Sequence, residues 1–93
     1  MTINLSPISG QVKTIIEIVD ENTLIYNGVT YDFTAIPNGG EVQASEPATG
    51  KITKDSNGII SISLQWFYDS QNCVYADRFP NNPYNIAKGV LNV

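Results

Sequence analysis

The sequence predicts an all-β fold, a small antiparallel sandwich or partly open barrel of about five to seven short strands. Two glycine turns and the alternating residues beside them carry this prediction. Asn27-Gly28 is the clearer turn, because a two-residue hairpin connection needs positive φ at both central residues, and Asn followed by Gly reaches it at low steric cost. Asp55-Ser-Asn-Gly58 is the second turn, and both turns adjoin segments in which apolar and polar residues alternate.

The first hairpin belongs to a predicted three-stranded meander over residues 12–33. Val12–Val19 is rich in β-branched residues, which favour strands. Asp20-Glu-Asn22 has the composition of the turn that follows, and residues 24–33 then form the hairpin itself. Such a sheet has one apolar face, so a second layer of structure must cover it.

Residues Ile59–Phe67 form the second anchor of the predicted core. One face of this segment carries Ile60, Ile62, Leu64 and Trp66, and the other carries Ser61, Ser63 and Gln65. This clean alternation is typical of an amphipathic strand. We expect a central strand that packs its large side chains against Ile16, Leu24 and Tyr26 or against their opposite-face neighbours.

The remaining candidate strands are shorter. Ile3–Pro7 alternates briefly and then reaches a proline, which cannot donate to a strand ladder, so this segment is predicted to be an edge strand at best. Thr34–Gly40 holds a proline and a glycine pair and is predicted to be a connection. Glu41–Ala44 and Gly50–Lys54 are weak strand candidates on the far side of that connection.

The sequence predicts a single β domain over residues 1–93, in which residues 77–93 form an extended, loop-rich C-terminal segment. Cys73–Ala76 is a candidate short strand. Arg78–Asn85 has two prolines and three asparagines among eight residues, so it is expected to run extended over the surface and not to form a helix or central strand. Ile86–Val93 is mildly apolar, and we expect it to add to the sheet edge of another subunit.

Length and charge limit the possible partners. A chain of 93 residues has room for one domain, and a domain of this size buries only about 60–65% of the surface that its unfolded chain exposes. The 9 acidic and 5 basic side chains give a net charge of −4, and the basic ones are scattered along the chain. Proteins that bind nucleic acid cluster Lys and Arg on one face, so we expect no nucleic-acid partner.

The sequence holds one cysteine and no histidine. Cys73 alone cannot form an internal disulfide, which fits a reducing compartment. The lack of histidine excludes histidine-based general base catalysis and the commonest zinc ligand. The N-terminus lacks the basic start and apolar run of a signal peptide, and no segment reaches the length of a transmembrane helix. We therefore expect a protein made and folded in the cytoplasm, without a membrane span.

Neither a metal site nor a cofactor site is predicted. Asp20–Asn22 and Asp55–Gly58 place oxygen atoms at alternate positions, as calcium loops do, but neither continues into the fixed Gly and bidentate Glu of an EF-hand. Turns in which the Asp or Asn side chain bonds its own backbone are the simpler interpretation. Cys73 has no histidine to activate it, so we interpret it as a partly buried structural thiol and expect no catalytic residue.

Aromatic side chains are the candidates for a contact surface. Rings on strands either line a sugar-binding platform or form the core and rim of a sheet, which is the commoner outcome. Trp66-Phe67-Tyr68 places three consecutive rings on a strand, so they must point to both faces and at least one must lie outside the main core. Such a ring lies under a loop or in an interface. The predicted interface residues are Trp66, Phe67, Tyr68, Arg78, Phe79 and Tyr84.

Two segments carry a family resemblance. In Asn22–Gly40 a hairpin ends in Asp32-Phe33 and runs into a Pro-x-Gly loop, and Gly50–Leu64 contains the second hairpin. Together they resemble a group of short uncharacterised proteins encoded beside the tail and tail-fibre genes of tailed bacteriophages and prophages. The resemblance covers roughly residues 12–68 and leaves the C-terminal quarter unaccounted for. It implies a phage origin and a place in the structure or assembly of a tail or fibre, with no catalytic residues to transfer.

Two kinds of function follow as hypotheses. A non-enzymatic, tail-associated structural or assembly protein would act through contacts with tail or tail-fibre proteins and with copies of itself, in the host cytoplasm during assembly and in the virion where it stays bound. The alternative is a phage-encoded inhibitor of a host defence system, which would bind a host protein or a small signalling molecule. An enzyme is the weakest hypothesis, because no paired carboxylates at a recognisable spacing and no phosphate loop are present.

Overall fold

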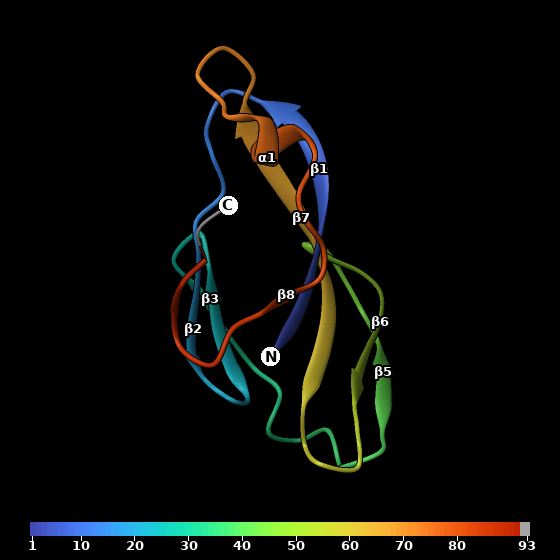
Figure 1. The fold of residues 1–93 in the computed structure, drawn as a ribbon. Coiled ribbons are helices and arrows are strands. Elements are labelled where there is room, and N and C mark those ends of the chain that lie inside the picture. Colours follow the sequence, from blue (N-terminus) through green and yellow to red (C-terminus); the bar gives the residue numbers. More distant parts are fainter. Residues whose placement is uncertain (92–93) are drawn as a thin grey trace.

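Two β-sheets packed face to face make up the fold (Figure 1). The computed structural model describes residues 1–91. Its elements are β1 (Thr2–Gly10), β2 (Ile16–Asp20), β3 (Thr23–Tyr26), β4 (Val29–Asp32), β5 (Glu41–Gln43), β6 (Ala48–Lys54), β7 (Ile60–Asp69), α1 (Tyr75–Arg78), β8 (Tyr84–Asn85) and β9 (Gly89–Val90). The strand orders are β5-β6-β7-β1-β8 and β4-β3-β2-β9. The predicted all-β sandwich is confirmed, with nine strands among residues 1–91 and two separate sheets in place of a barrel.

The predicted amphipathic strand forms the centre of the larger sheet. β7 pairs with β6 on one side and with β1 on the other. Its buried side chains are Ile60, Ile62, Leu64 and Trp66, as the alternation predicted. They belong to one continuous core with Ile16, Leu24 and Tyr26 of the smaller sheet. The expected packing of this strand against the meander is therefore confirmed.

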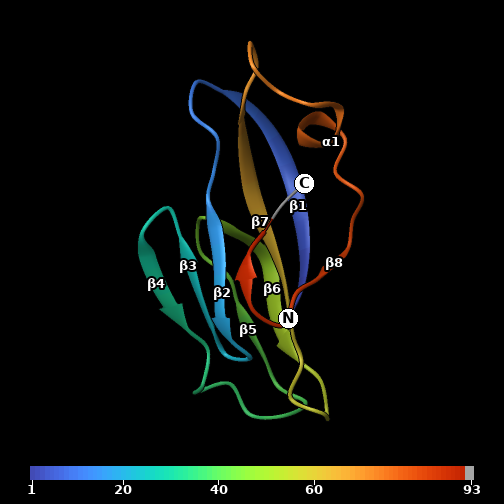
Figure 2. The same ribbon diagram turned by 60° about the vertical axis from the view of Figure 1, so that its left-hand side comes forward.

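The predicted meander is the smaller sheet. β2, β3 and β4 pair in antiparallel order, and Figure 2 shows them lying across one face of the larger sheet. Asn27 and Gly28 have φ values of 48° and 84°, so both central residues of this hairpin are in the left-handed region, as the Asn-Gly pair predicted. The backbone N–H of Asn22 bonds Asp20 Oδ1 at 2.9 Å, which confirms a side-chain-stabilised turn between β2 and β3.

The prediction that the first segment is at best an edge strand is wrong. β1 has nine residues and lies between β7, to which it is parallel, and β8, to which it is antiparallel. Pro7 is tolerated because the N–H of Leu5 points to the β8 side, where it bonds Asn82 Oδ1 at 2.8 Å. Residues two apart on a strand point the same way, so the nitrogen of Pro7 also faces away from β7. β8 pairs only with Thr2 and Ile3, so no strand needs a donor from Pro7.

The second predicted strand starts four residues later than expected, at Ile16 instead of Val12. Residues 11–15 cross from the larger sheet to the smaller one. Thr14 forms two hydrogen bonds with β7 of the larger sheet. Its N–H donates to Phe67 O, and its Oγ1 accepts the N–H of Phe67, both at 2.8 Å. The N–H of Ile15 donates instead to Asn27 Oδ1, in the hairpin of the smaller sheet, at 2.8 Å. A segment that changes sheets cannot keep one ladder, so only the later residues pair as a strand.

The C-terminal predictions are corrected in two places. Residues 73–76 do not form a strand, and the helical turn α1 begins at Tyr75 because the carboxylate of Asp77 accepts the N–H of Val74 at 3.1 Å. The tail is also less loop-rich than expected, since it contains β8, which pairs with β1, and β9, which pairs with β2. Its addition to the sheet edge of another subunit stays a prediction. The end of the predicted tail, residues 92–93, lies outside the described residues.

Replacing Trp66 by Ala tests the core assignment. Because the indole is almost fully buried, we expect the free energy of unfolding in urea to fall by about 3–5 kcal/mol. Tyr75→Ala is the matched control, since that ring is exposed and its loss should change the free energy by no more than about 0.5 kcal/mol. A cost for Trp66→Ala below about 1 kcal/mol would contradict the assignment.

Candidate functional site

The three consecutive aromatic residues divide between core and periphery. Trp66 is only 1% exposed and belongs to the core cluster, so it does not lie on a surface of this structure. Phe67 and Tyr68 are half-buried and lie outside that cluster. The prediction that at least one of the three rings lies outside the main core is therefore confirmed.

Two further predicted interface residues gather beside α1, at the upper end in Figure 1. The guanidinium of Arg78 lies 5.5 Å from the ring centre of Tyr68 and donates to Ser70 O at 2.9 Å. Phe79 is 62% exposed and packs against Tyr75, which is 77% exposed, with 5.0 Å between ring centres. An exposed aromatic pair therefore lies on the outer face of α1.

Tyr84 lies apart from this aromatic pair. It is on β8, pairs with Ile3 of β1 and packs half-buried against the core. Its hydroxyl oxygen accepts the N–H of Asn81 at 2.8 Å. Tyr84 therefore supports the C-terminal segment, and the structure does not bring it together with Arg78 and Phe79.

A buried ion pair joins α1 to the rest of the fold. Asp77 is buried, and its Oδ1 lies 3.0 Å from Nζ of Lys13, whose side chain is half-exposed. The same ammonium lies 5.5 Å from the ring centre of Trp66. The 11–15 crossing segment, β7 and α1 thus meet around one carboxylate, and this contact holds α1 against the sandwich.

The surroundings of Asp77 lower its pKa. Burial on its own would raise the pKa of this carboxyl group, but hydrogen bonds from Lys13 and from the N–H of Val74, the charge of Lys13 and the nearby indole of Trp66 outweigh it. The indole of Trp66 makes the smallest of these contributions. The ionised form is therefore the stable one in the folded protein.

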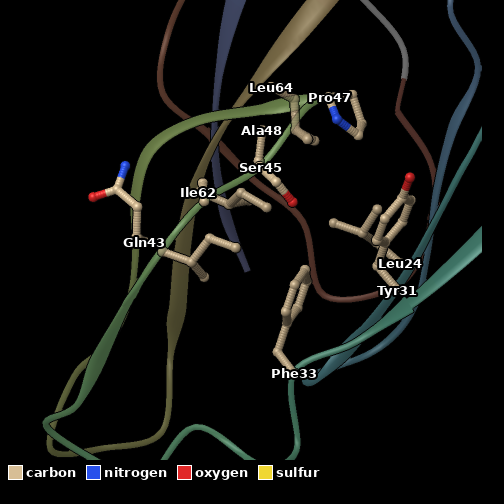
Figure 3. A pocket seen from close by; sticks show the side chains of 11 residues that line it. Leu24, Tyr31, Phe33, Gln43, Ser45, Pro47, Ala48, Ile62 and Leu64 are labelled. Atoms are coloured by element: carbon tan, nitrogen blue, oxygen red, sulfur yellow. The ribbon is translucent and has the colours of Figure 1, made fainter.

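An apolar cleft lies between the two sheets (Figure 3). Its volume is about 130 Å³, close to the roughly 150 Å³ of a cavity that holds a benzene ring. Its walls come from both sheets and from the loop after β5. They are formed by Leu24, Tyr31, Phe33, Gln43, Ala44, Ser45, Pro47, Ala48, Ile52, Ile62 and Leu64.

The cleft is apolar inside, with one carboxylate in the loop beside it. Figure 3 shows Tyr31 and Phe33 facing Ile62 and Leu64 across the opening. Glu46 is exposed between the lining residues Ser45 and Pro47, whereas Asp32 alternates with Tyr31 and Phe33 and so points away from the cleft. Hydrogen bonds from the side chain and backbone of Thr34, with a smaller effect of Lys54, lower the pKa of Asp32, so this carboxyl group is ionised at neutral pH.

The cleft opens between two edge strands, β4 and β5, one from each sheet. The two residues that flank β5 bond β6: the N–H of Lys54 donates to Gly40 O, and the N–H of Ala44 donates to Gly50 O, both at 2.9 Å. Backbone groups alternate in direction along a strand, so those of Glu41 and Gln43 point outward. This edge therefore offers hydrogen-bonding groups that no other strand of residues 1–91 uses.

The acidic turns and the cysteine are structural. Asp55 Oδ1 accepts the N–H groups of Asn57 and Ile59 at 2.8 and 2.9 Å, which confirms the interpretation of this turn as side-chain bonding to the local backbone. Within residues 1–91 no three Asp, Glu or Cys side chains come together as metal ligands do. Cys73 is half-buried, and its Sγ lies 3.2 Å from Nε of Arg78. No helix of this described part has the length and apolar character needed to cross a membrane.

Comparison of the sequence with protein-family models and with curated proteins, and of the structure with solved structures, finds no match.

Sequence reasoning missed the cleft and one member of the aromatic pair. The sequence placed Tyr31 and Phe33 in the first hairpin, but the opposite wall of the cleft belongs to the other sheet. Its position depends on how the two sheets stack, which the sequence does not show. Tyr75 was assigned to a strand and left out of the interface, although it stands four residues before Phe79, the spacing at which side chains meet on a helix. That spacing is the one signal in the sequence that indicates the pair.

The lowered pKa of Asp77 predicts a pH dependence of stability. A carboxyl group whose pKa is lower in the folded than in the unfolded chain stabilises the fold above its unfolded pKa, near 3.9, and this contribution is lost as the pH falls through the folded value. We expect Asp77→Asn to cost about 1–3 kcal/mol at pH 7, and to show a smaller loss of unfolding free energy than the wild type on acidification to about pH 2. Urea unfolding at several pH values measures this, and equal losses in the two proteins would contradict it.

Proposed function

We propose that this chain is a non-enzymatic binding module, a structural or assembly component of a phage tail that acts through protein–protein contacts. The single observation that carries the contact part of this proposal is the apolar cleft between the two edge strands β4 and β5. The tail part rests on the sequence resemblance described above. Both parts are compatible with an all-β sandwich of this size.

The occupant of the cleft is an extended segment of another protein that carries one large apolar side chain. A volume of about 130 Å³ accommodates a single Leu-sized or Phe-sized group and not a larger ligand. The lining is mostly aliphatic and aromatic, so burial of such a side chain is favourable by about 1.5–3 kcal/mol. One side chain alone gives weak binding, so further contacts must come from the partner's backbone.

The free edge of β5 supplies those contacts. An extended segment that adds beside β5 bonds the outward N–H and C=O groups of Glu41 and Gln43. Its side chains alternate between the two faces of the enlarged sheet, so every second one points toward the smaller sheet and the cleft. By strand addition, a single partner segment would therefore both bond the free backbone groups of β5 and fill the apolar cleft.

An acidic residue beside the cleft sets the charge of the partner. Glu46 is exposed between the lining residues Ser45 and Pro47, and it forms no ion pair with a Lys or Arg of residues 1–91. Glu41 is neutralised by Lys51 at 3.0 Å. We therefore expect Lys or Arg beside the apolar residue of the partner segment, since complementary charge raises the association rate and disfavours acidic competitors.

A substitution at the mouth of the cleft tests the contact surface. Ser45→Trp should fill the opening, because Ser45 lines the mouth and is exposed. We expect a ten-residue peptide of alternating Lys and Leu or Phe to shift the amide NMR signals of β4 and β5 in the wild type and to bind the variant at least about tenfold more weakly.

Ser56→Trp is the matched control, in the exposed turn before β7, and should leave peptide binding unchanged. Signal shifts confined to β8 and α1, or equal binding by Ser45→Trp and the wild type, would contradict the assignment of the cleft. The tail assignment has its own test, which is mass spectrometry of purified phage particles. Recovery at stoichiometric copy number supports a tail protein, whereas absence from the particle favours an inhibitor of a host defence system.

A further inference from the structure

A polar pocket lies at the end of the sandwich opposite α1, the lower end in Figure 1. Its volume is about 310 Å³, within the roughly 300–1,000 Å³ typical of small-molecule sites. The turn between β2 and β3, the loop before β5 and the turn before β7 surround it, and Lys54 of β6 reaches it from inside. The polar residues on its walls are Glu21, Asn22, Asn38, Lys54 and Asn57.

Lys54 is the unusual member of this set. It is only 6% exposed, and its Nζ donates to Phe33 O at 3.2 Å. An ammonium group has three protons to donate, so this carbonyl satisfies only one of them. No Asp or Glu of residues 1–91 lies within ion-pair distance of it, although Asp32 is near enough to feel its charge. A buried cation without a close counter-ion is costly, so a chain that needs only stability would place an apolar residue here.

Side-chain amides accompany Lys54 on the walls of the pocket. Asn22, Asn38 and Asn57 bring three of them from separate turns and loops. The pocket thus combines ammonium protons that need acceptors with amide groups that both donate and accept. A ligand that satisfies both must donate and accept hydrogen bonds at neighbouring positions.

The charges around the pocket decide the class of ligand. Two cations, the ammonium of Lys54 and the α-ammonium of the wall residue Met1, are balanced by two carboxylates, Glu21 on the wall and Asp55 in the adjoining turn. This balance favours neither an anion nor a metal cation. A neutral molecule with several hydroxyl groups meets both conditions, because each hydroxyl donates one hydrogen bond and accepts others. We propose that this pocket binds a neutral saccharide.

Amide NMR titration of the full chain tests this proposal with defined probes. The probes are glucose, galactose, mannose and N-acetylglucosamine, each added to about 100 mM, since a small polar site binds with millimolar dissociation constants. At least one of them should shift the side-chain amide signals of Asn22, Asn38 and Asn57 in a saturable way. Inorganic phosphate and calcium chloride, added separately, should not shift these signals.

Lys54→Met is the decisive variant, because it keeps the length of the side chain and removes the charge. We expect it to bind the same sugar at least about tenfold more weakly while its melting temperature stays equal to or above that of the wild type. Lys51→Met is the matched control. That lysine is on the same strand with an exposed ammonium, and its loss should leave sugar binding unchanged. If Lys54→Met does not fold, Asn57→Ala, on the exposed turn, takes its place and should weaken binding by a similar factor.

Three results would overturn the proposal. The first is the lack of any saturable shift with the four sugars. The second is a shift of the three asparagine signals by phosphate or calcium and not by sugar. The third is sugar binding that Lys54→Met retains unchanged, or that Asn57→Ala retains unchanged where Lys54→Met does not fold. None of these results bears on the cleft between β4 and β5, which lies elsewhere on the molecule and uses different residues.

Discussion

The parallel pairing of β1 with β7 is the constraint on which the rest of the structure depends. It runs from Thr2 opposite Ser61 to Gly10 opposite Asp69 and joins segments about sixty residues apart in the chain. It places Ile3 and Leu5 beside Ile62 and Leu64, so the apolar rows of two strands form one surface for the smaller sheet to cover. Between these strands the chain forms β2, β3 and β4 of the opposite layer and then returns as β5 and β6 of the same sheet, which leaves β4 and β5 as edges with the cleft between them.

Sequence patterns correctly predicted the features that depend on residues close together in the chain. The positive φ at Asn27 and Gly28, the turn at Asp55 and the buried row from Ile60 to Trp66 all follow from interactions among near neighbours. The parallel partner of β7 did not follow, because Pro7 breaks the pattern of β1. A missing donor matters only where a neighbouring strand needs one, and the direction of that nitrogen depends on tertiary pairing.

The candidate site was less predictable than the fold because it depends on tertiary contacts between distant segments. Trp66 was placed in an interface from its neighbours alone, but it is buried, and Lys13, distant in the sequence, lies over its ring while paired with Asp77. Lys54 reads as an ordinary polar residue of a weak strand, and its burial becomes visible only when the loops close around it. The sandwich thus presents an apolar hollow between its edges and a polar hollow at one end, and each is built from segments distant in sequence.

Native-state hydrogen exchange followed by NMR tests this account most directly, because it reads the central pair and the open edge in one experiment. The account predicts the slowest amide exchange in β7 around Ile62 and Leu64 and in β1 at Asn4 and Ser6, whose N–H groups face β7 because that of Leu5 faces the other way. It predicts fast exchange at Glu41 and Gln43, whose N–H groups point away from β6. Exchange at Glu41 and Gln43 as slow as in β7 would show that the edge is already covered. Together with fast exchange in β1, it would contradict both the arrangement and the binding role inferred from it.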